Sequence, residues 1–352
     1  MHLFESLVLG GITLRNRIAV SPMCQYSARD GNPTSWHLVH LGSRAVGGAG
    51  LVMTEATAVE SRGRISPGDT GIWLDSQAEG WAPIARFIAE QGAVPGIQLA
   101  HAGRKASTAV PWKGGLGVSP EQGGWPTLAP SAIAFDNGYP LPSEMTEGDI
   151  DAVVLAFSSA ARRALGAGFQ LLEIHAAHGY LLHEFLSPLS NHRRDDYGGS
   201  FDNRIRPLRR VVAAIRATVP ESVPVLVRIS ATDWADGGWD IEQSCALAEA
   251  IRGDGVTLVD VSSGGTVPSA KIPLGPGYQT PFAAEIRRRT GMRTGAVGMI
   301  TAPEQADHIV RTDQADLVFL AREMLRDPYW PRRAARSLGA TMPGPVQYGR
   351  AW

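Results

Sequence analysis

Cysteine is nearly absent from this sequence: Cys24 and Cys245 are the only two in 352 residues. Two cysteines cannot form the disulfide framework of a small secreted domain, and they fit a reducing compartment. No apolar stretch approaches the ~20 residues that a membrane-spanning helix needs. The start, MHLFESLVLGG, lacks the basic region and the long apolar run of a signal peptide. We therefore expect a soluble, cytoplasmic protein.

An excess of charge of either sign is also lacking, because 33 Lys and Arg face 34 Asp and Glu, for a net charge of −1. A chain balanced in this way, with a pI near 6.8, offers no electrostatic footprint for nucleic acid or an anionic membrane. Hydrophobic residues make up 44% of the chain and charged residues 19%. These shares indicate a globular protein with ample material for a core.

Short apolar runs recur along the chain, rich in Leu and β-branched residues, as is typical of parallel strands buried on both faces. We expect strands at Ile18–Ser21, Leu51–Thr54, Pro95–Leu99, Leu171–His175, Val225–Ile229, Leu258–Ser262, Thr294–Met299 and Leu317–Leu320. Helices are expected between them at Ala78–Gln91, Asp149–Ala167, Arg204–Thr218, Ile241–Asp254, Pro281–Thr290 and Pro303–Arg311. This alternation predicts an α/β fold, a (β/α)8 TIM barrel, as one domain over residues 1–352. A doubly wound sheet is the main structural alternative.

One interval breaks this alternation. The segment at about residues 105–143, between the third strand and the third helix, is rich in Gly and Pro and contains Trp112, Trp125 and Tyr139. It shows no clear helical period. Long irregular connections in compact domains are usually functional, so we expect a capping insert over the end of the barrel.

The carboxyl ends of the strands, where such barrels place their chemistry, carry an unusual set of residues. Only one strand end supplies histidines, whereas a metal hydrolase would show carboxylates or histidines converging from several strands. The other ends bring an amide, a thiol, a guanidinium and glycines, which suit a planar heteroaromatic ligand with an anionic tail. The residues are Ser21 to Cys24 with Tyr26, Glu55, Ala56, Gln98, His101, His175, His178, Tyr180, Arg228, Ser262 to Gly265, Gly298, Ala321 and Arg322.

Three of these positions have their own arguments. Taken by itself, Gln98 could be a buried amide whose hydrogen bonds are all made within the protein, or it could contact a ligand. Arg228 lies inside the apolar run PVLVRIS, and because an unpaired buried charge is costly, it needs an anionic or electron-rich partner, such as the N1–C2=O edge of a flavin. Gly298 lies near the end of the seventh strand, in the corner where barrels bind phosphate.

The stretch 173-EIHAAHGYLLHEFLSPLSN-191 allows three interpretations: a structural histidine pair, a metal site, or a polar clamp. A metal site lacks a third ligand of standard spacing, so no metal is expected. Two neutral imidazoles, His175 and His178, can instead donate to one carbonyl or nitro oxygen and stabilise enolate charge. Tyr180, two residues further on, can deliver a proton.

Together these motifs resemble the Old Yellow Enzyme family. His175-Ala-Ala-His178-Gly-Tyr180 and the following Asn191-His-Arg193 resemble its signature, and Ser21-Pro-Met-Cys24-Gln-Tyr26 is similar to the start of its thermophilic-like class. The resemblance covers essentially the whole chain. It implies non-covalent FMN as cofactor and NADPH as hydride donor. Its cofactor-binding positions are Ser21, Pro22, Met23, Cys24, Ala56, Gln98, Arg228, Gly298, Ala321 and Arg322, with Cys24 tuning the flavin's redox potential.

The resemblance also implies a reaction. NADPH reduces FMN, and the flavin N5 then delivers hydride to Cβ of an α,β-unsaturated aldehyde, ketone, imide or nitroalkene in a ping-pong cycle. His175 and His178 hold the substrate oxygen, Tyr26 shapes the pocket and Tyr180 protonates Cα. The C-terminal tail, residues 345–352, brings Arg350 and Trp352 into the substrate site of a neighbouring subunit, which implies a homodimer or a dimer-based tetramer.

Two rival functions stay open at this point. A Schiff-base barrel aldolase would use Lys105 or Lys271, although neither lysine lies in a predicted strand. A flavin-binding sensor without turnover would leave Tyr180 and the histidine pair without a purpose.

Overall fold

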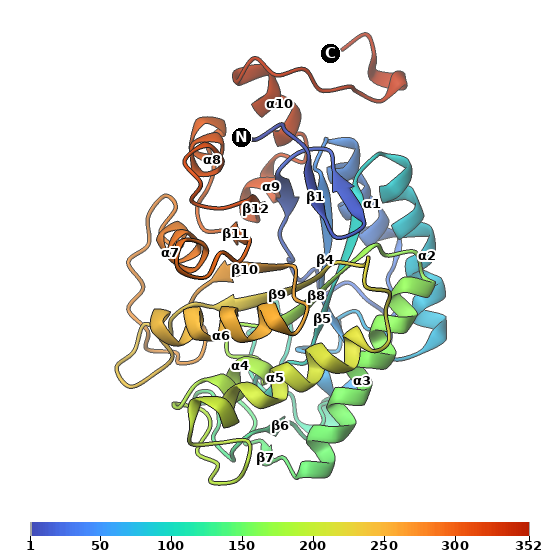
Figure 1. Cartoon of the computed structure of the whole chain (residues 1–352). Helices are drawn as coiled ribbons and strands as arrows, with labels where there is room; N and C mark the ends of the chain where they lie inside the picture. The colour runs from blue at the N-terminus through green and yellow to red at the C-terminus, as the bar shows by residue number, and fades with distance from the viewer. Residues whose placement is uncertain (1, 352) are drawn as a thin grey trace.

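Eight parallel strands close into a barrel in the computed structural model, which describes residues 2–351 (Figure 1). Each strand is hydrogen-bonded to the next, and the last pairs with the first. In order around the barrel they are β3 (Ile18–Val20), β4 (Leu51–Ala58), β5 (Val94–Ala100), β8 (Leu171–Ala176), β9 (Val225–Ser230), β10 (Leu258–Ser262), β11 (Thr294–Ala296) and β12 (Leu317–Leu320). All eight coincide with predicted strands, so the predicted TIM barrel is confirmed.

Helices surround the barrel, and in Figure 1 they lie outside its strands. Every predicted helix is present, within three residues of its expected start. The helices are α1 (Ser35–Val46), α2 (Asp75–Glu90), α3 (Glu147–Gly166), α4 (Leu181–Leu186), α5 (Phe201–Arg216), α6 (Ile241–Gly253), α7 (Thr280–Thr290), α8 (Pro303–Arg311), α9 (Arg322–Arg326) and α10 (Trp330–Ser337). Within residues 2–351, no helix is long and apolar enough to cross a membrane.

Helix α1 is absent from the sequence prediction because its pattern of burial is inverted. Trp36 and Val39 are 53% and 64% exposed, whereas the polar His37 and Arg44 are buried. A helix is recognised from sequence by an apolar face that packs on the core. In α1, polar side chains occupy much of the face that packs on the core, because they make contacts near the candidate active site described below.

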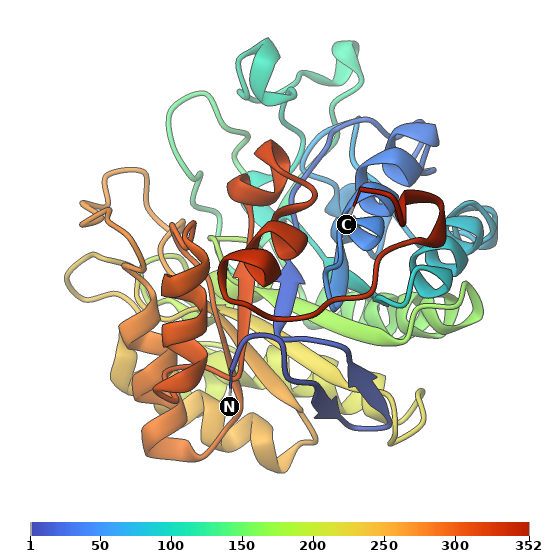
Figure 2. The same ribbon diagram turned by 90° about the horizontal axis from the view of Figure 1, so that it is seen from above.

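An N-terminal hairpin, also not predicted, covers the amino end of the barrel. Its strands β1 (Leu7–Leu9) and β2 (Ile12–Leu14) pair antiparallel, and Leu9 and Leu14 pack into the lower barrel core. The backbone N–H of Gly11 donates to the carbonyl of Ser222, just before β9. Figure 2 shows this hairpin at the opposite end of the barrel from the loops of the 105–143 segment.

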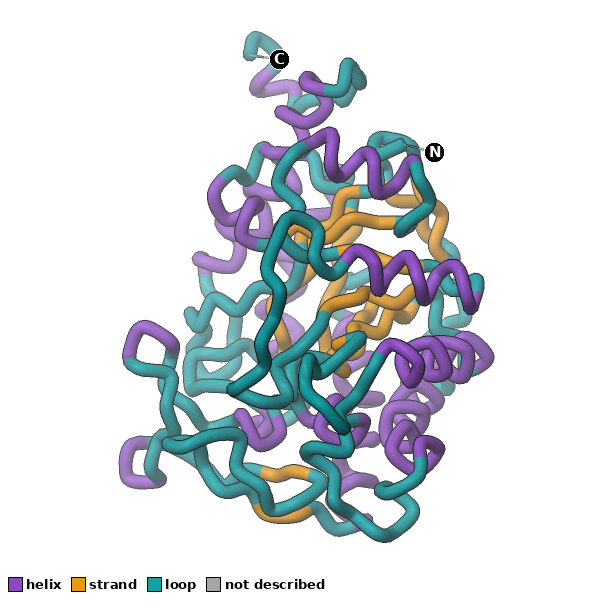
Figure 3. Tube along the Cα trace, turned by 90° about the vertical axis from the view of Figure 1, so that its left-hand side faces the viewer, coloured by secondary structure: helices purple, strands orange, loops and turns teal. Residues whose placement is uncertain are grey.

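The segment 105–143 is irregular, as the sequence predicts, and most of it is loop (Figure 3). Short elements punctuate it: η2 (Gly103–Lys105), η3 (Pro111–Lys113), η4 (Pro120–Gln122) and the paired β6 (Leu128–Ala129) and β7 (Ser143–Glu144). Trp125 fastens it to the loop after β4, because its Nε1 donates to the Arg62 carbonyl at 2.8 Å and its ring lies under Arg64.

Candidate active site

Four consecutive strands each place one polar side chain inside the barrel, in two pairs that are offset by two residues between β8 and β9. The strand register pairs Gln98 of β5 with Glu173 of β8, and Arg228 of β9 with Asp260 of β10. Nε2 of Gln98 donates to Oε1 of Glu173 at 2.8 Å, and Nε of Arg228 lies 3.2 Å from Oδ2 of Asp260. From the sequence, Arg228 is expected to need an anionic or electron-rich partner such as a flavin edge, and Asp260 supplies an anionic one from within the chain.

These contacts leave the Arg228 guanidinium with hydrogen-bond donors to spare. It is 5% exposed and its Nη1 donates to Oγ of Ser21 at 3.0 Å, but its Nη2 donates to no group within residues 2–351. Burial raises the pKa of Glu173 to about 8, with a further contribution from Asp260. Arg228 therefore faces one buried carboxylate and one carboxyl that holds its proton near neutral pH, which leaves positive charge for a ligand.

The two predicted histidines lie together. The ring centroids of His175 and His178 are 5.2 Å apart with nearly perpendicular planes, and the Tyr180 ring lies 5.1 Å from that of His175. Burial, followed by the charge of Arg228, lowers the pKa of both histidines well below the usual value, so both rings are neutral. Among the described residues, no third side chain joins them in a group that could hold a metal.

The ring nitrogens of His175 and His178 are not all engaged by the described residues, so this pair can still bind a ligand. The buried Nδ1 of His175 has no hydrogen-bond partner within residues 2–351. Nε2 of His178 lies 2.7 Å from Oγ of Ser262, and its backbone N–H donates to Oγ of Ser230. The backbone of His178 is left-handed, with φ +61°, a conformation that a residue other than glycine rarely adopts, and these two contacts help to hold it.

A buried contact between a histidine and a carboxylate supports this turn from behind. His183 and Asp233 are fully buried 3.0 Å apart, and the backbone N–H of Gly179 donates to Nδ1 of His183. Burial alone would raise the pKa of Asp233, but His183 outweighs it and lowers the pKa to about 2. His183 therefore holds the turn in place, away from the ligand.

A cavity of about 380 Å³ lies beside Tyr180, bordered by Tyr26, Lys105 and the 108–116 part of the insert. Burial raises the pKa of Tyr180 well above its usual value, so its hydroxyl keeps its proton. Nζ of Lys105 lies 5.1 Å from the centre of the Tyr180 ring and donates to the carbonyls of His178 and Gly265. From the sequence, Lys105 is a candidate only as a Schiff-base lysine, because its position beside Tyr180 depends on the loop after β5.

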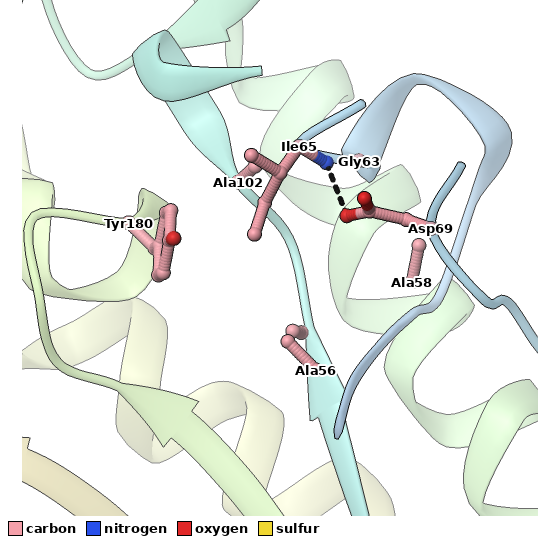
Figure 4. Close-up of a pocket in the computed structure, with 8 residues that line it drawn as sticks. Ala56, Ala58, Gly63, Ile65, Asp69, Ala102 and Tyr180 are labelled. Carbon is pink, nitrogen blue, oxygen red and sulfur yellow. Dashed lines mark hydrogen bonds between the residues drawn. The ribbon is translucent and has the colours of Figure 1, made fainter. Parts of the chain in front are cut away.

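Cys24 and Tyr26 lie in the irregular segment after β3, near the bulge in β4 that precedes Ala56. The Tyr26 ring packs edge-on against Trp112 of the insert at 5.8 Å. Figure 4 shows Ala56, Tyr180 and Asp69 around a narrow pocket, with a carboxyl oxygen of Asp69 accepting the Ile65 backbone N–H. Burial raises the pKa of Asp69 to about 7.

The ends of β10, β11 and β12 border a second cavity of about 380 Å³, lined by Ser262, Gly298, Ala321 and Arg322. Gly298 has φ +121°, and a Cβ there would lie 2.8 Å from Nε2 of Gln279. Only glycine fits this backbone without strain. The cavity, its backbone amides and the exposed Arg322 can accommodate an anionic group.

These residues fit FMN. Arg228 has a free donor, Gln98 lies two strands away inside the same barrel, and the cavity at Gly298 is also lined by Arg322. Residues 21–24 follow β3 directly, and Ala56 lies in β4, the neighbouring strand, near its carboxyl end.

The predicted tail residues lie elsewhere. Arg350 is exposed and lines neither cavity, and residues 343–347 run in a groove beside Arg15, Val46 and Arg332. The short helix η5 (Val346–Tyr348) forms part of this tail. Trp352 lies outside the described residues.

The site has the composition of a flavin-dependent oxidoreductase, and comparison with known proteins agrees. The model of the NADH:flavin oxidoreductase / NADH oxidase family matches residues 2–340. The NADPH dehydrogenase of Geobacillus sp. (strain WCH70) is 49% identical to this chain, over 99% of it and 98% of the relative.

Solved structures agree as well. Morphinone reductase in complex with tetrahydroNAD superposes with a TM-score of 0.81 at 26% identity, covering 98% of this chain and 93% of that one. The old yellow enzyme homologue from Zymomonas mobilis gives 0.79 at 27% identity, covering 97% and 94%. The chain belongs to the NADH:flavin oxidoreductase / NADH oxidase family, which confirms the predicted Old Yellow Enzyme resemblance, the enzyme class and the flavin cofactor.

Proposed function

We propose that this enzyme uses NADPH and non-covalently bound FMN to reduce the activated C=C bond of α,β-unsaturated aldehydes, ketones, imides or nitroalkenes. The observation that carries the proposal is the neutral pair His175 and His178, perpendicular to each other and next to the protonated Tyr180. Bound FMN would accept hydride from NADPH and pass it from N5 to Cβ of the alkene in a ping-pong cycle.

The residues of the chain would act on the substrate's oxygen and on one proton. With the Ser262 hydroxyl donating to Nε2 of His178, the ring proton of His178 is on Nδ1. This N–H and a ring N–H of His175 would donate to the substrate oxygen, and stabilising the developing enolate in this way is commonly worth about 3 kcal/mol. Tyr180 gives its proton to Cα. Tyr26 borders the pocket in which the substrate lies.

For the cofactor, we assign the ring system to Ser21, Cys24, Ala56 and Gln98, its pyrimidine edge to Arg228, and its phosphate to Gly298, Ala321 and Arg322. Pro22 and Met23 complete the wall. The raised pKa of Glu173 supports this assignment, because a protonated Glu173 leaves Arg228 with net positive charge for the reduced ring.

We further propose a cytoplasmic homodimer or dimer-based tetramer, as one domain with residues 105–143 as a lid and residues 345–352 reaching a partner's site. The exposed Trp36 and Val39 of α1 support an interface, as does the distance of the tail from its own cavities.

Colour and turnover test the proposal. The purified protein should be yellow, bleach with NADPH without oxygen, and regain colour with cyclohexenone. In His175→Ala, phenol binding should weaken and recolouring should slow by about a hundredfold with FMN still bound. Unchanged recolouring in this variant would refute the clamp, and failure of NADPH to bleach the protein would favour a sensor.

One observation keeps the aldolase as a second candidate: Lys105 lies half-buried beside the cavity, and desolvation lowers its pKa to about 8. Its Nζ donates to two carbonyls, however, which holds it as an ammonium. Borohydride trapping of a carbonyl substrate on Lys105 would support the aldolase.

A further inference from the structure

The segment that carries Cys24 has no secondary structure of its own and is held by Glu55 of β4, which in turn contacts His37 of α1. Residues 22–28 belong to no helix or strand. The backbone N–H of Gln25, next to Cys24, donates to Oε2 of Glu55 at 2.9 Å. Oε1 of the same carboxyl lies 3.0 Å from Nε2 of His37, and these two side chains are 2% and 1% exposed.

The position of the His37 proton follows from the chain's own donors. The backbone N–H of Thr34 donates to Nδ1 of His37 at 2.8 Å, so Nδ1 is an acceptor and the ring proton is on Nε2, which faces Glu55. The Nε2–Oε1 contact is poorly aligned for a hydrogen bond, and neither atom has another partner within residues 2–351. It is a short electrostatic contact between a neutral ring and a carboxylate, so the pair carries one negative charge.

That charge lies near the Cys24 side chain. Glu55 of β4 and Asp69 of the following loop are the carboxyl groups that face Cys24, and the hydroxyls of Tyr26 and Tyr180 are the other titratable groups near it. Removal from water raises the pKa of the Cys24 thiol, and Asp69 and Glu55 raise it further. Asp69 is itself partly protonated near pH 7, because burial raises its pKa to about 7.

We propose that Glu55 and His37 are positioning residues for Cys24: His37 lies against the Glu55 carboxylate, and Glu55 holds the Cys24–Gln25 backbone in place and adds its negative charge to the surroundings that disfavour a thiolate. This rests on the proposed function, in which Cys24 lies at the edge of FMN. A thiol there can donate a hydrogen bond, whereas a thiolate would place negative charge beside a ring that must accept hydride.

The experiment measures how fast iodoacetamide alkylates Cys24 in the FMN-loaded enzyme, by mass spectrometry, from neutral to alkaline pH. Cys245→Ser removes the other thiol in every variant. Because the thiolate is the reactive form, Glu55→Gln should raise the rate at neutral pH about tenfold, equal to a shift of about one pH unit. The matched control is Asp233→Asn, which removes an equally buried carboxylate beside His183. Its alkylation rate should vary with pH as it does in the Cys245→Ser parent.

A Glu55→Gln profile that coincides with the parent's would overturn the proposal, and so would an equal shift in Asp233→Asn. If Glu55→Gln does not fold, His37→Ala and His37→Gln decide. His37→Ala should weaken FMN binding about tenfold, and His37→Gln, whose amide both accepts and donates, should restore most of it. Unchanged FMN affinity in His37→Ala would overturn the positioning role.

Alkylation of Cys24 does not depend on turnover. A yellow enzyme that reduces enones but shows no Glu55 effect contradicts this inference alone. A protein that binds no FMN, or that NADPH does not bleach, contradicts the proposed function itself.

Discussion

Nε2 of His178, which follows β8, lies 2.7 Å from the hydroxyl oxygen of Ser262 at the end of β10. The contact spans the intervening strand β9 and uses one of the two ring nitrogens. Nδ1 of His178 has no partner within residues 2–351, so the serine determines which nitrogen can face a ligand.

Ser262→Ala should release the His178 ring. Loss of one neutral hydrogen bond is worth about 1 kcal/mol, so we expect phenol binding and the enone half-reaction to weaken about fivefold, with FMN retained. Stopped-flow recolouring of the reduced enzyme measures this. Ser263→Ala is the control, because both serine hydroxyls lie within hydrogen-bond distance of Gln279 but only that of Ser262 contacts His178. Equal effects of the two variants would contradict the assignment.

Gly298→Ala should impair FMN binding. The added Cβ would lie 2.8 Å from Nε2 of Gln279, on a backbone with φ +121° that favours glycine. We expect at least a tenfold weaker FMN affinity, measured by fluorescence titration of the apoprotein. Gly237→Ala is the control: its φ is +71°, but a Cβ there meets open space outside the site. Wild-type affinity in Gly298→Ala would place the phosphate elsewhere.

Glu184→Gln should flatten the pH dependence of stability. Burial raises the pKa of Glu184 to about 8 from an ordinary 4.5, so the folded state binds this proton more tightly than the unfolded state. Its contribution is complete below pH 4.5 and is lost as pH rises through 8. Each unit of difference between the folded and unfolded pKa values is worth about 1.4 kcal/mol. As pH rises from 4.5 to 8, wild type should therefore lose several kcal/mol of unfolding free energy that the variant does not lose. Urea unfolding across this range measures the difference, and parallel curves for the two proteins would disprove it.

Removal of the last four residues, which include Arg350, should leave the barrel intact. If the tail completes a partner's site, the deletion should raise the KM for enones and weaken assembly, because no tail residue from 343 to 350 lines the Tyr180 cavity of its own chain. Analytical ultracentrifugation and steady-state kinetics test both effects. Unchanged assembly together with unchanged turnover would exclude this role.

Much of the fold is predictable from the sequence because the signal for each buried strand is local. Each of the eight strands is a short apolar run, and polar residues mark where it ends. Helix α1 shows the limit of this reasoning. His37 and Arg44 are buried, and Trp36 is exposed, for reasons that lie in residues far away in the chain.

The sequence by itself determined which side chains stand at the strand ends, from Ser21 to Arg322, and the spacing that places His175, His178 and Tyr180 on one turn. Only the tertiary structure decided which of them meet. Barrel closure brings Asp260 to Arg228, Ser262 to His178 and His37 to Glu55, and the loop after β5 brings Lys105 to Tyr180. These contacts join residues distant in sequence, and their geometry depends on strand register and loop path, which no local pattern of hydrophobicity contains.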